Sequence, residues 1–358
     1  MENLKIPTIR YEDFINASQV NAQAKRKPLN GQWEITFRCN LRCIHCYVVE
    51  DPAKKELTFP EITDILDQIH HEGCLWLCLT GGEPLVREDF LDIYTYAKKK
   101  GFLITLFTNG TLITPEIADY LQEYPPFMID ITLNGITSQT YERITRVPGS
   151  FERCLRGIHL ILERNLPLTL KSIGMTLNRD EILKIKEYVE GLRNVRFRYD
   201  SVIIPRLDGS KEPCQFRLSS HRVVEIEYSD HNMRGEWKDC FQSYHELSEP
   251  ENLFRCGGGI SSFNISPYGD LALCHLLRRP SFNLREGSFR QGFCQLFPRI
   301  RSAKFHTNSK CKDCNIWYLC PQCPGRAQLE NGDPQIPVNY FCELAHEREA
   351  MKPILLVE

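Results

Sequence analysis

The sequence has no hydrophobic run long enough to cross a membrane. A transmembrane helix needs about 18 or more consecutive apolar residues, and no stretch of the 358-residue chain provides them. The N-terminus also lacks an apolar segment behind a positive cluster, so it does not have the pattern of a signal peptide. These absences predict a cytoplasmic protein with no membrane partner.

Net charge is also small. Lys and Arg number 44 and Asp and Glu number 46, which gives a formal net charge of −2. Nucleic-acid binding needs a broad positive surface, so nucleic acid is not an expected partner. The short basic runs at 98–100 and 278–279 are typical of solvated helix ends or loops.

Cysteine, in contrast, is abundant, with 16 residues in the chain. Because cytosolic thiols are kept reduced, clustered cysteines in that compartment indicate metal binding or catalysis rather than disulfides. The cysteine pattern therefore carries most of the functional information.

Short apolar segments alternate with amphipathic ones through the first 203 residues. Thr58 and Glu61 form a capping-box pattern for one helix, and Asn178 can cap a later one. Six right-handed βαβ units predict an α/β fold, a partial (β/α)6 barrel open on one side, with chemistry at the C-terminal strand ends. The expected strands are nearly continuous in apolar character, as in parallel strands buried on both faces, and are 33–37, 75–80, 103–108, 127–133, 168–177 and 195–203.

The character of the sequence changes after residue 204. The next fifty residues are polar without a clear period, and the segment from Cys256 to Cys342 is rich in glycine, proline and cysteine. Such a segment usually needs metal to hold it together. The expected organisation is an N-terminal extension (1–30), a barrel (31–204), a bridge (205–255), a small cysteine-rich domain (256–345) and a C-terminal tail (346–358).

Three cysteines follow the first strand at C-x3-C-x2-C spacing, namely Cys39, Cys43 and Cys46. Three thiolates from one loop can bind a [4Fe–4S] cluster and leave the fourth iron without a protein ligand. A structural zinc site is the alternative, but zinc usually takes four ligands and favours paired C-x2-C motifs.

This motif resembles that of the radical SAM superfamily, and the resemblance covers most of the chain. It implies that the open iron binds the amino and carboxylate groups of S-adenosylmethionine (SAM). It also implies that an electron from the cluster cleaves SAM to methionine and a 5′-deoxyadenosyl radical, which abstracts hydrogen from a substrate. His45 takes the position whose backbone meets the adenine in this family, and Tyr47 follows two residues later.

A second signature, Gly81-Gly82-Glu83-Pro84, follows the second strand. Glycines allow the backbone to approach a ligand closely, and Glu83 can accept hydrogen bonds from a positive amino group. The signature resembles the family's GGEP motif, which holds the amino end of SAM. Lys171 has two interpretations, a partner of the SAM carboxylate or a lysine at a strand edge. The SAM-binding candidates at the ends of the third, fourth and fifth strands are Thr108, Asn109, Thr132, Asn134 and Lys171.

The C-terminal cysteines resemble the SPASM domain, an auxiliary iron–sulfur domain of radical SAM enzymes that modify peptides and sulfatases. Two residues rather than the family's usual three precede Cys323, and a hairpin turn at 267–270 is expected to present Cys274. The resemblance implies two auxiliary [4Fe–4S] clusters, hence three clusters in all. Their ligands would be Cys256, Cys274 and Cys323 for the first, and Cys311, Cys314, Cys320 and Cys342 for the second. A zinc ribbon at 311–323 is the alternative, but it leaves Cys256, Cys274 and Cys342 unexplained.

Six cysteines lie outside these sets. Cys74, Cys78 and Cys154 are expected to pack in the core, with Cys74 and Cys78 on the same face of a strand. The first auxiliary set is one ligand short, so its fourth iron is either open to substrate or bound by a distant residue such as Cys240. Cys214 is expected near the substrate opening, where it could donate a hydrogen atom. Cys294 has no assignment.

The sequence therefore predicts a radical SAM enzyme that modifies a peptide or protein, as maturases of ribosomally made peptides do. The product could be a crosslink, a thioether, an epimer or an oxidised side chain. Expected partners are the peptide substrate and a flavodoxin- or ferredoxin-type electron donor. Because only about thirty residues precede the first strand, a leader-peptide-binding domain is expected to be either a separate protein or absent. The alternatives are a radical SAM dehydrogenase of a small alcohol or sugar-like metabolite, and a non-catalytic zinc or iron–sulfur scaffold.

Overall fold

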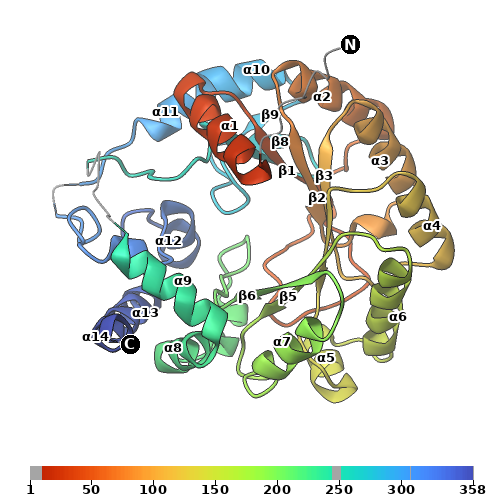
Figure 1. Cartoon of the computed structure of the whole chain (residues 1–358). Helices are drawn as coiled ribbons and strands as arrows, with labels where there is room; N and C mark the ends of the chain where they lie inside the picture. Colours follow the sequence, from red (N-terminus) through yellow and green to blue (C-terminus); the bar gives the residue numbers. More distant parts are fainter. Residues whose placement is uncertain (1–9, 244–250, 307, 358) are drawn as a thin grey trace, which may run out of the picture.

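A nine-stranded sheet frames the computed structural model, which describes residues 10–243, 251–306 and 308–357 (Figure 1). Parts of the expected extension, bridge and tail therefore lie outside the described residues. The strand order is β6-β5-β4-β3-β2-β1-β7-β8-β9. The first six strands run parallel, and they are β1 Asn30–Thr36, β2 Trp76–Gly81, β3 Leu103–Thr108, β4 Met128–Thr132, β5 Leu168–Ile173 and β6 Val195–Asp200.

These six strands confirm the predicted partial barrel. The bounds of β3 are as predicted, whereas β5 and β6 are shorter than predicted. Helices cover the outer face of the curved sheet, and their apolar stripes pack against it (Figure 1). They are α2 Phe59–His71, η1 Pro84–Val86, α3 Phe90–Lys99, α4 Pro115–Glu123, α5 Ser138–Thr145, α6 Ser150–Glu163 and α7 Ile182–Glu190.

Two predicted helix caps have different outcomes. The capping box of α2 is confirmed, because the Thr58 backbone N–H donates to Glu61 at 2.7 Å. Asn178 does not cap α7, which begins at Ile182. Its buried amide instead donates to the backbone oxygens of Asn134 and Ile173, both at 2.9 Å. Asn178 therefore ties the end of β5 to the segment that follows β4.

The cysteine-rich region continues the barrel sheet. Strand β7 (Ser262–Ile265) pairs in parallel with β1, and β8 (Asp270–Ala272) and β9 (Phe282–Asn283) follow antiparallel. The turn between β7 and β8 confirms the predicted hairpin, and Gly269 adopts a φ of +86° there. β1 consequently has a barrel strand on one side and a strand of the cysteine-rich region on the other.

Helices also form where a bridge and a tail were expected. Arg348 on α13 donates to Glu227 on α8 at 2.6 and 3.0 Å, and both side chains are buried. This ion pair fixes α13, the helix that carries Cys342, against α8. The helices of these segments are η2 Glu212–Phe216, α8 Ser220–Ser229, α9 His231–Gln242, α13 Asn339–Ala350 and α14 Lys352–Val357.

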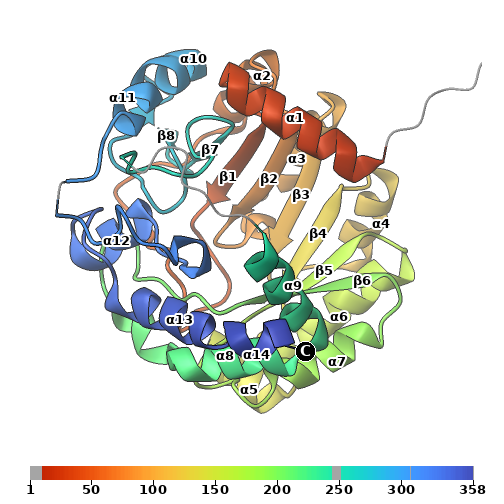
Figure 2. The ribbon, with the colours of Figure 1, turned by 60° about the vertical axis from the view of Figure 1, so that its left-hand side comes forward.

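One helix before the first strand covers the N-terminal end of the barrel, and the remaining helices lie in the cysteine-rich region. Helix α1 (Tyr11–Lys25) crosses the N-terminal ends of β1 to β4, as Figure 2 shows, and the Phe14 ring lies 6.2 Å from that of Trp76. The others belong to the cysteine-rich region and are α10 Phe289–Gln291, the π-helical turn η3 Gly292–Leu296, α11 Phe297–Arg301, η4 Trp317–Leu319 and α12 Pro324–Asn331.

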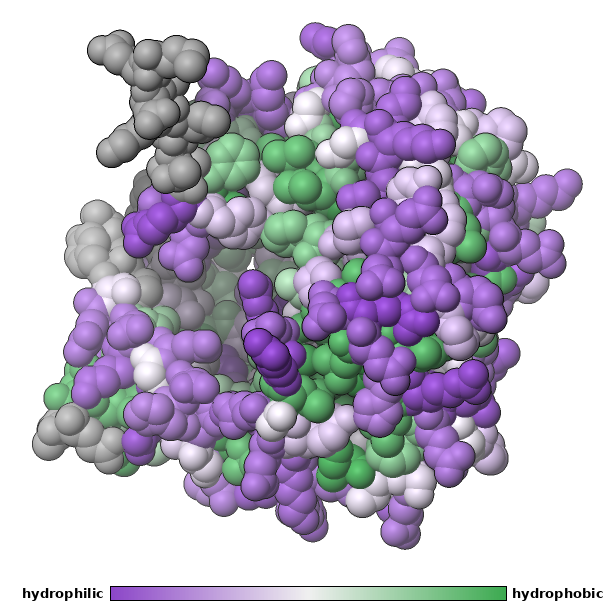
Figure 3. Space-filling model, turned by 45° about the vertical axis from the view of Figure 1, so that its right-hand side comes forward, coloured by the Kyte–Doolittle hydropathy of each residue, from purple (hydrophilic) through white to green (hydrophobic). Residues whose placement is uncertain are grey.

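The face of the molecule that Figure 3 shows is mainly hydrophilic. No helix in the described ranges is long and apolar enough to span a bilayer.

The Arg348–Glu227 pair gives a test of how the C-terminal helices are held. In Arg348→Met, Glu227 becomes an uncompensated buried charge, which should cost about 3–5 kcal/mol of local stability. Hydrogen–deuterium exchange should therefore speed up in α8 and α13. The control Arg10→Met breaks an exposed pair with Asp13 and should leave exchange there unchanged. Unaltered protection of α8 and α13 in Arg348→Met would contradict this account.

Candidate functional site

The first cysteine set forms a compact loop at the C-terminal end of β1. Negative charge on Cys46 would act on both Cys39 and Cys43, so the three thiols lie close together. Burial is the main cause that raises the pKa of Cys39 to about 11, and it raises that of Cys43 further. Metal binding at this loop therefore has to displace protons from the thiols.

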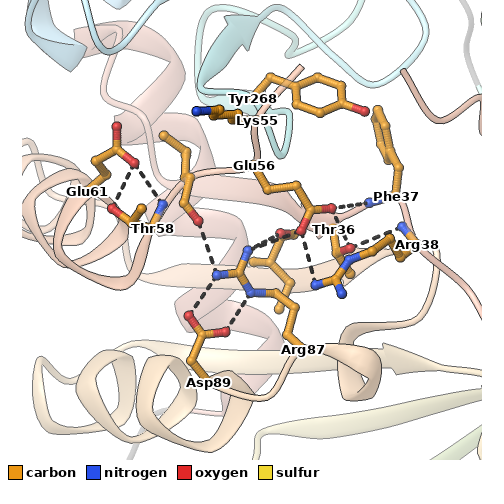
Figure 4. Close-up of polar contacts among 12 residues, drawn as sticks. Thr36, Phe37, Arg38, Lys55, Glu56, Thr58, Glu61, Arg87, Asp89 and Tyr268 are labelled. Atoms are coloured by element: carbon orange, nitrogen blue, oxygen red, sulfur yellow. Dashed lines mark hydrogen bonds and ion pairs between the residues drawn. The ribbon is translucent and has the colours of Figure 1, made fainter. Parts of the chain in front are cut away.

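A buried arginine fixes the segment that leads into this loop (Figure 4). Arg87 donates to the backbone oxygen of Ile35 at 3.0 Å and to both carboxylate oxygens of Asp89 at 2.8 and 2.7 Å. Glu56 lies 3.6 Å from the same guanidinium and accepts a 2.6 Å hydrogen bond from Thr36. These contacts hold the last residues of β1 in place just before Cys39.

Gly82 of the second signature lies where the end of β2 contacts the backbone that follows β1. Gly82 N–H donates to Thr36 O at 2.8 Å, and Glu83 N–H donates to Arg38 O at 2.9 Å. A Cβ on Gly82 would overlap the carbonyl oxygens of Phe37 and Arg38. Glycine at this position therefore lets the end of β2 lie directly against the segment before Cys39.

Glu83 joins the ends of the second and third strands. Its carboxylate is fully buried, and burial raises its pKa to about 7. Oε1 accepts hydrogen bonds from Thr108 at 2.7 Å and from Leu85 N–H at 3.2 Å, while Oε2 accepts one from Asn109 N–H at 2.7 Å. Oε2 thus retains acceptor capacity for a cofactor amino group. The Asn109 amide lies 3.9 Å from Cys39 Sγ, so both signatures meet at the cysteine loop.

The two candidates for the ribose differ in accessibility. Asn134 is only 2% exposed, its Nδ2 lies 3.4 Å from His45 Nε2, and its Oδ1 accepts from Ile173 N–H at 2.8 Å. Thr132, at the end of β4, is half-buried. Burial lowers the pKa of His45 to about 4, so its ring is neutral. Thr132 is therefore the more accessible candidate, and Asn134 positions His45.

Lys171 is not an edge lysine, because β5 lies between β4 and β6. That interpretation is wrong. Its Nζ lies 3.5 Å from Asp130 Oδ2 and 3.2 Å from the centre of the Phe107 ring. Burial lowers the pKa of Lys171, and the nearby Asp130 opposes that shift. A SAM carboxylate at this ammonium would have to share it with Asp130.

The packing prediction holds for two of the three cysteines. Cys74 and Cys154 are buried in the hydrophobic core. Cys78 instead lies on the inner face of the barrel, where Lys171 and Asp130 are close enough to influence its pKa, which burial raises to about 12. The parity argument fails because Cys74 precedes β2, so strand alternation does not extend to it.

A buried carboxylate that the sequence analysis missed connects the two cysteine regions. Glu34 in β1 has no exposed surface, and it accepts hydrogen bonds from Arg278 at 2.6 Å, Asn264 at 3.2 Å and Tyr47 at 3.5 Å. Tyr47 follows Cys46, and Arg278 lies four residues after Cys274. The sequence signal that could have identified Glu34 is a charged residue inside a strand that was expected to be buried.

The three cysteines of the first auxiliary set lie near one another. Cys323 and Cys256 both lie near enough to raise the pKa of Cys274, although burial is the larger cause. Backbone N–H groups point at two of the sulfurs, from Leu277 to Cys274 at 3.4 Å and from Arg326 to Cys323 at 3.5 Å. Such donors favour thiolates.

The second auxiliary set also gathers in one place. Burial raises the pKa of Cys320 to about 11, and Cys342, Cys311 and Cys314 all act on it electrostatically. These thiols come from two segments of the chain. Cys314 lies in the loop before η4, and Cys342, 28 residues later, lies in α13.

The donor chemistry of the three sets suits iron–sulfur clusters. All ten side chains are thiols, and thiolates are the ligands that [4Fe–4S] clusters take. Among the described residues, no three His, Cys, Asp or Glu side chains form a group that could hold a single metal ion.

Two further cysteines lie outside the three sets. Cys240, in α9, packs on a hydrophobic cluster that includes Ile316 and Leu319 and that Cys314 and Cys320 also contact. Cys214, in η2, is half-buried and lies near Arg217, which forms an ion pair with Glu330 on α12.

Comparison with known proteins agrees with this geometry. The model of the family described as "Radical SAM superfamily" matches residues 33–189. The protein contains a radical SAM domain. Its C-terminal cysteine region is of the SPASM type. The domain implies that this radical SAM protein binds SAM and a [4Fe–4S] cluster.

Three similar proteins have related folds or sequences. AdoMet-dependent heme synthase of Methanosarcina barkeri is 28% identical over 84% of this chain and 92% of its own length. Mycofactocin maturase MftC of Mycolicibacterium smegmatis is 26% identical over 91% of this chain and 86% of its own. The crystal structure of Streptococcus suis SuiB bound to S-adenosylmethionine has a TM-score of 0.68 at 17% identity, and it covers 93% of this chain and 83% of that one. This last likeness shows the fold.

The Gly82 contact gives a direct test of the site. Gly82→Ala should push β2 away from the segment before Cys39, and we expect SAM affinity to fall at least about tenfold, measured by equilibrium dialysis of the reconstituted protein. Gly235→Ala is the control, because a Cβ at that helical position meets no atom within 4 Å. Wild-type SAM affinity in Gly82→Ala would show that this contact does not shape the site.

Proposed function

We propose that this radical SAM protein modifies a peptide or protein through radical chemistry that begins with reductive cleavage of SAM. The observation that carries the proposal is the convergence of the three-cysteine loop, Gly82 and Asn109 at the C-terminal strand ends. When bound there, a [4Fe–4S] cluster would supply the electron that cleaves SAM. The likeness to MftC, a maturase by name, supports the peptide substrate.

The chain's own residues have separable tasks in this proposal. Cys39, Cys43 and Cys46 would hold the cluster, and the Glu83 carboxylate would receive the SAM amino group at Oε2. Lys171 would face the SAM carboxylate, and Thr132 the ribose. Buried side chains such as Ile44 and Asn134 would limit the access of water to the space beside the cysteine loop, which would protect a radical from quenching.

The two auxiliary cysteine sets would bind two further [4Fe–4S] clusters. Cys240 packs beside the second set rather than the first, which favours an open iron in the first cluster that can bind substrate. Cys214 would serve as hydrogen donor if the product is an epimer. A cytoplasmic location, a separate leader-binding protein and a flavodoxin- or ferredoxin-type donor complete the proposal.

A second candidate is a heme-synthase-like reaction on a tetrapyrrole. The relative from Methanosarcina barkeri favours it, because the alignment spans 92% of that heme synthase. Titration with Fe-coproporphyrin III, followed by its visible absorption, would distinguish the candidates. Saturable binding of one porphyrin per chain supports the tetrapyrrole, and a flat titration supports the peptide.

Cysteine substitutions separate radical generation from product formation. Replacing Cys39, Cys43 and Cys46 by alanine should abolish 5′-deoxyadenosine formation with dithionite as reductant, while about eight of twelve irons and their absorbance persist. Cys342→Ala should retain some SAM cleavage but yield no modified product. Cys294→Ala is the control and should behave as wild type, since it lies outside all three sets. Continued reductive SAM cleavage by the triple variant would rule out the assigned site.

A further inference from the structure

A basic hollow lies at the end of the barrel opposite the SAM-binding loop. Its volume is about 320 Å³, and its lining residues come from the C-terminal ends of α1 and α2 and from α10 and η3. Figure 2 shows α1, α2 and α10 near one another. Glu72 is the single acidic side chain that lines it, and it pairs with Arg290 at 3.6 Å. The basic lining residues are Lys25, Arg26, Lys27, His71 and Arg290. We call this surface the basic cleft.

The basic cleft is continuous with a loop of the first auxiliary set. Arg26 donates to Gly259 O at 3.0 Å, on the loop that begins at Cys256. From the other side, Arg301 donates to Cys256 O at 2.9 Å and to Gly258 O at 2.7 Å. Two guanidinium groups therefore donate hydrogen bonds to the backbone of the loop that carries Cys256.

Cys256 is also unusual in its exposure. Of the ten cysteines assigned to the three sets, all of which are described, it is the only exposed one. The electron transfer rate falls steeply with distance, so an exposed ligand marks the shortest path from the surface to a cluster. Cys256 gives the first auxiliary set an edge at the surface, beside the basic cleft.

Positive charge here stands out against a chain that is slightly negative overall. Lys25, Arg26, Lys27 and Arg290 are exposed, and no ion pair of Lys25 or Lys27 occurs within the described residues. Such a local surplus attracts negatively charged partners over about 10 Å at about 0.1 M ionic strength, and over longer distances at lower salt, and it speeds their encounter. A small, charge-guided contact suits transient electron-transfer complexes.

We propose that the basic cleft docks an acidic one-electron carrier protein, and that the electron enters at the Cys256 edge of the first auxiliary set. This proposal rests on the proposed function, since each reductive cleavage of SAM consumes one electron. The carrier is oxidised by one electron, the iron–sulfur protein is reduced by one electron, and no bond forms or breaks at the cleft.

The test compares two double charge reversals on the reconstituted holoprotein. Lys25→Glu/Lys27→Glu changes the cleft, and Lys99→Glu/Lys184→Glu makes the same charge change at exposed lysines of α3 and α7. Binding of a flavodoxin, an acidic one-electron carrier, is measured by isothermal titration at 50 and 200 mM salt. We expect the cleft variant to weaken binding about tenfold or more and to flatten its salt dependence, while the control stays within about twofold.

Two further readouts separate docking from the chemistry. Carbodiimide should crosslink Lys25 or Lys27 to flavodoxin carboxylates, as mass spectrometry can show. Reduction of the clusters by dithionite, which needs no docking, should be the same in both variants and wild type. Equal loss of flavodoxin binding in both double variants, no loss in the cleft variant, or crosslinks confined to other lysines would overturn the proposal. Binding and crosslinking do not depend on the substrate, so they stand even if the proposed peptide modification fails.

Discussion

The burial of one carboxylate organises this molecule. Glu34 lies in the central strand β1 without any exposed surface, and an unpaired charge there would cost several kcal/mol. Arg278 compensates that charge at 2.6 Å, and Tyr47 and Asn264 contribute further hydrogen bonds. Because Tyr47 follows Cys46 and Arg278 lies four residues after Cys274, satisfying one charge brings the three-cysteine loop and the loop of Cys274 together.

The position of β1 in the sheet reinforces this arrangement. It pairs with β2 on one side, where Gly82 lies against its C-terminal end, and with β7 on the other, which leads through a hairpin to Cys274. The buried Arg87 fixes the same strand end through the backbone oxygen of Ile35. Barrel and cysteine-rich region thus share one sheet, so the relative position of their cysteines depends on strand register rather than on a linker.

Much of this could be predicted from local sequence pattern. Nearly continuous apolar segments are typical of buried parallel strands, and cysteine spacing within one loop depends only on chain geometry. Those signals predicted the six barrel strands and the three-cysteine loop. The sets of auxiliary cysteines followed from resemblance to a family, and the structure brings the same cysteines together.

Other features depend on contacts between distant segments, and sequence pattern does not contain them. β7 to β9 have four, three and two residues, too few to show a period, so their place in the barrel sheet was missed. The partners of Glu34 and Lys171, Arg278 and Asp130, come from other strands or loops. Cys78 was assigned to the core because strand parity was extended past the start of β2.

The most direct test of the account is anomalous diffraction at the iron edge from crystals of the anaerobically reconstituted protein. The account predicts three separate groups of iron. The first lies beside Cys39, Cys43 and Cys46, and the second lies beside Cys256, Cys274 and Cys323. The third lies beside Cys311, Cys314, Cys320 and Cys342. The first two groups should lie on either side of the Glu34–Arg278 pair. An increase in anomalous signal on crossing the zinc edge in either C-terminal set, or iron only at the first loop, would contradict it.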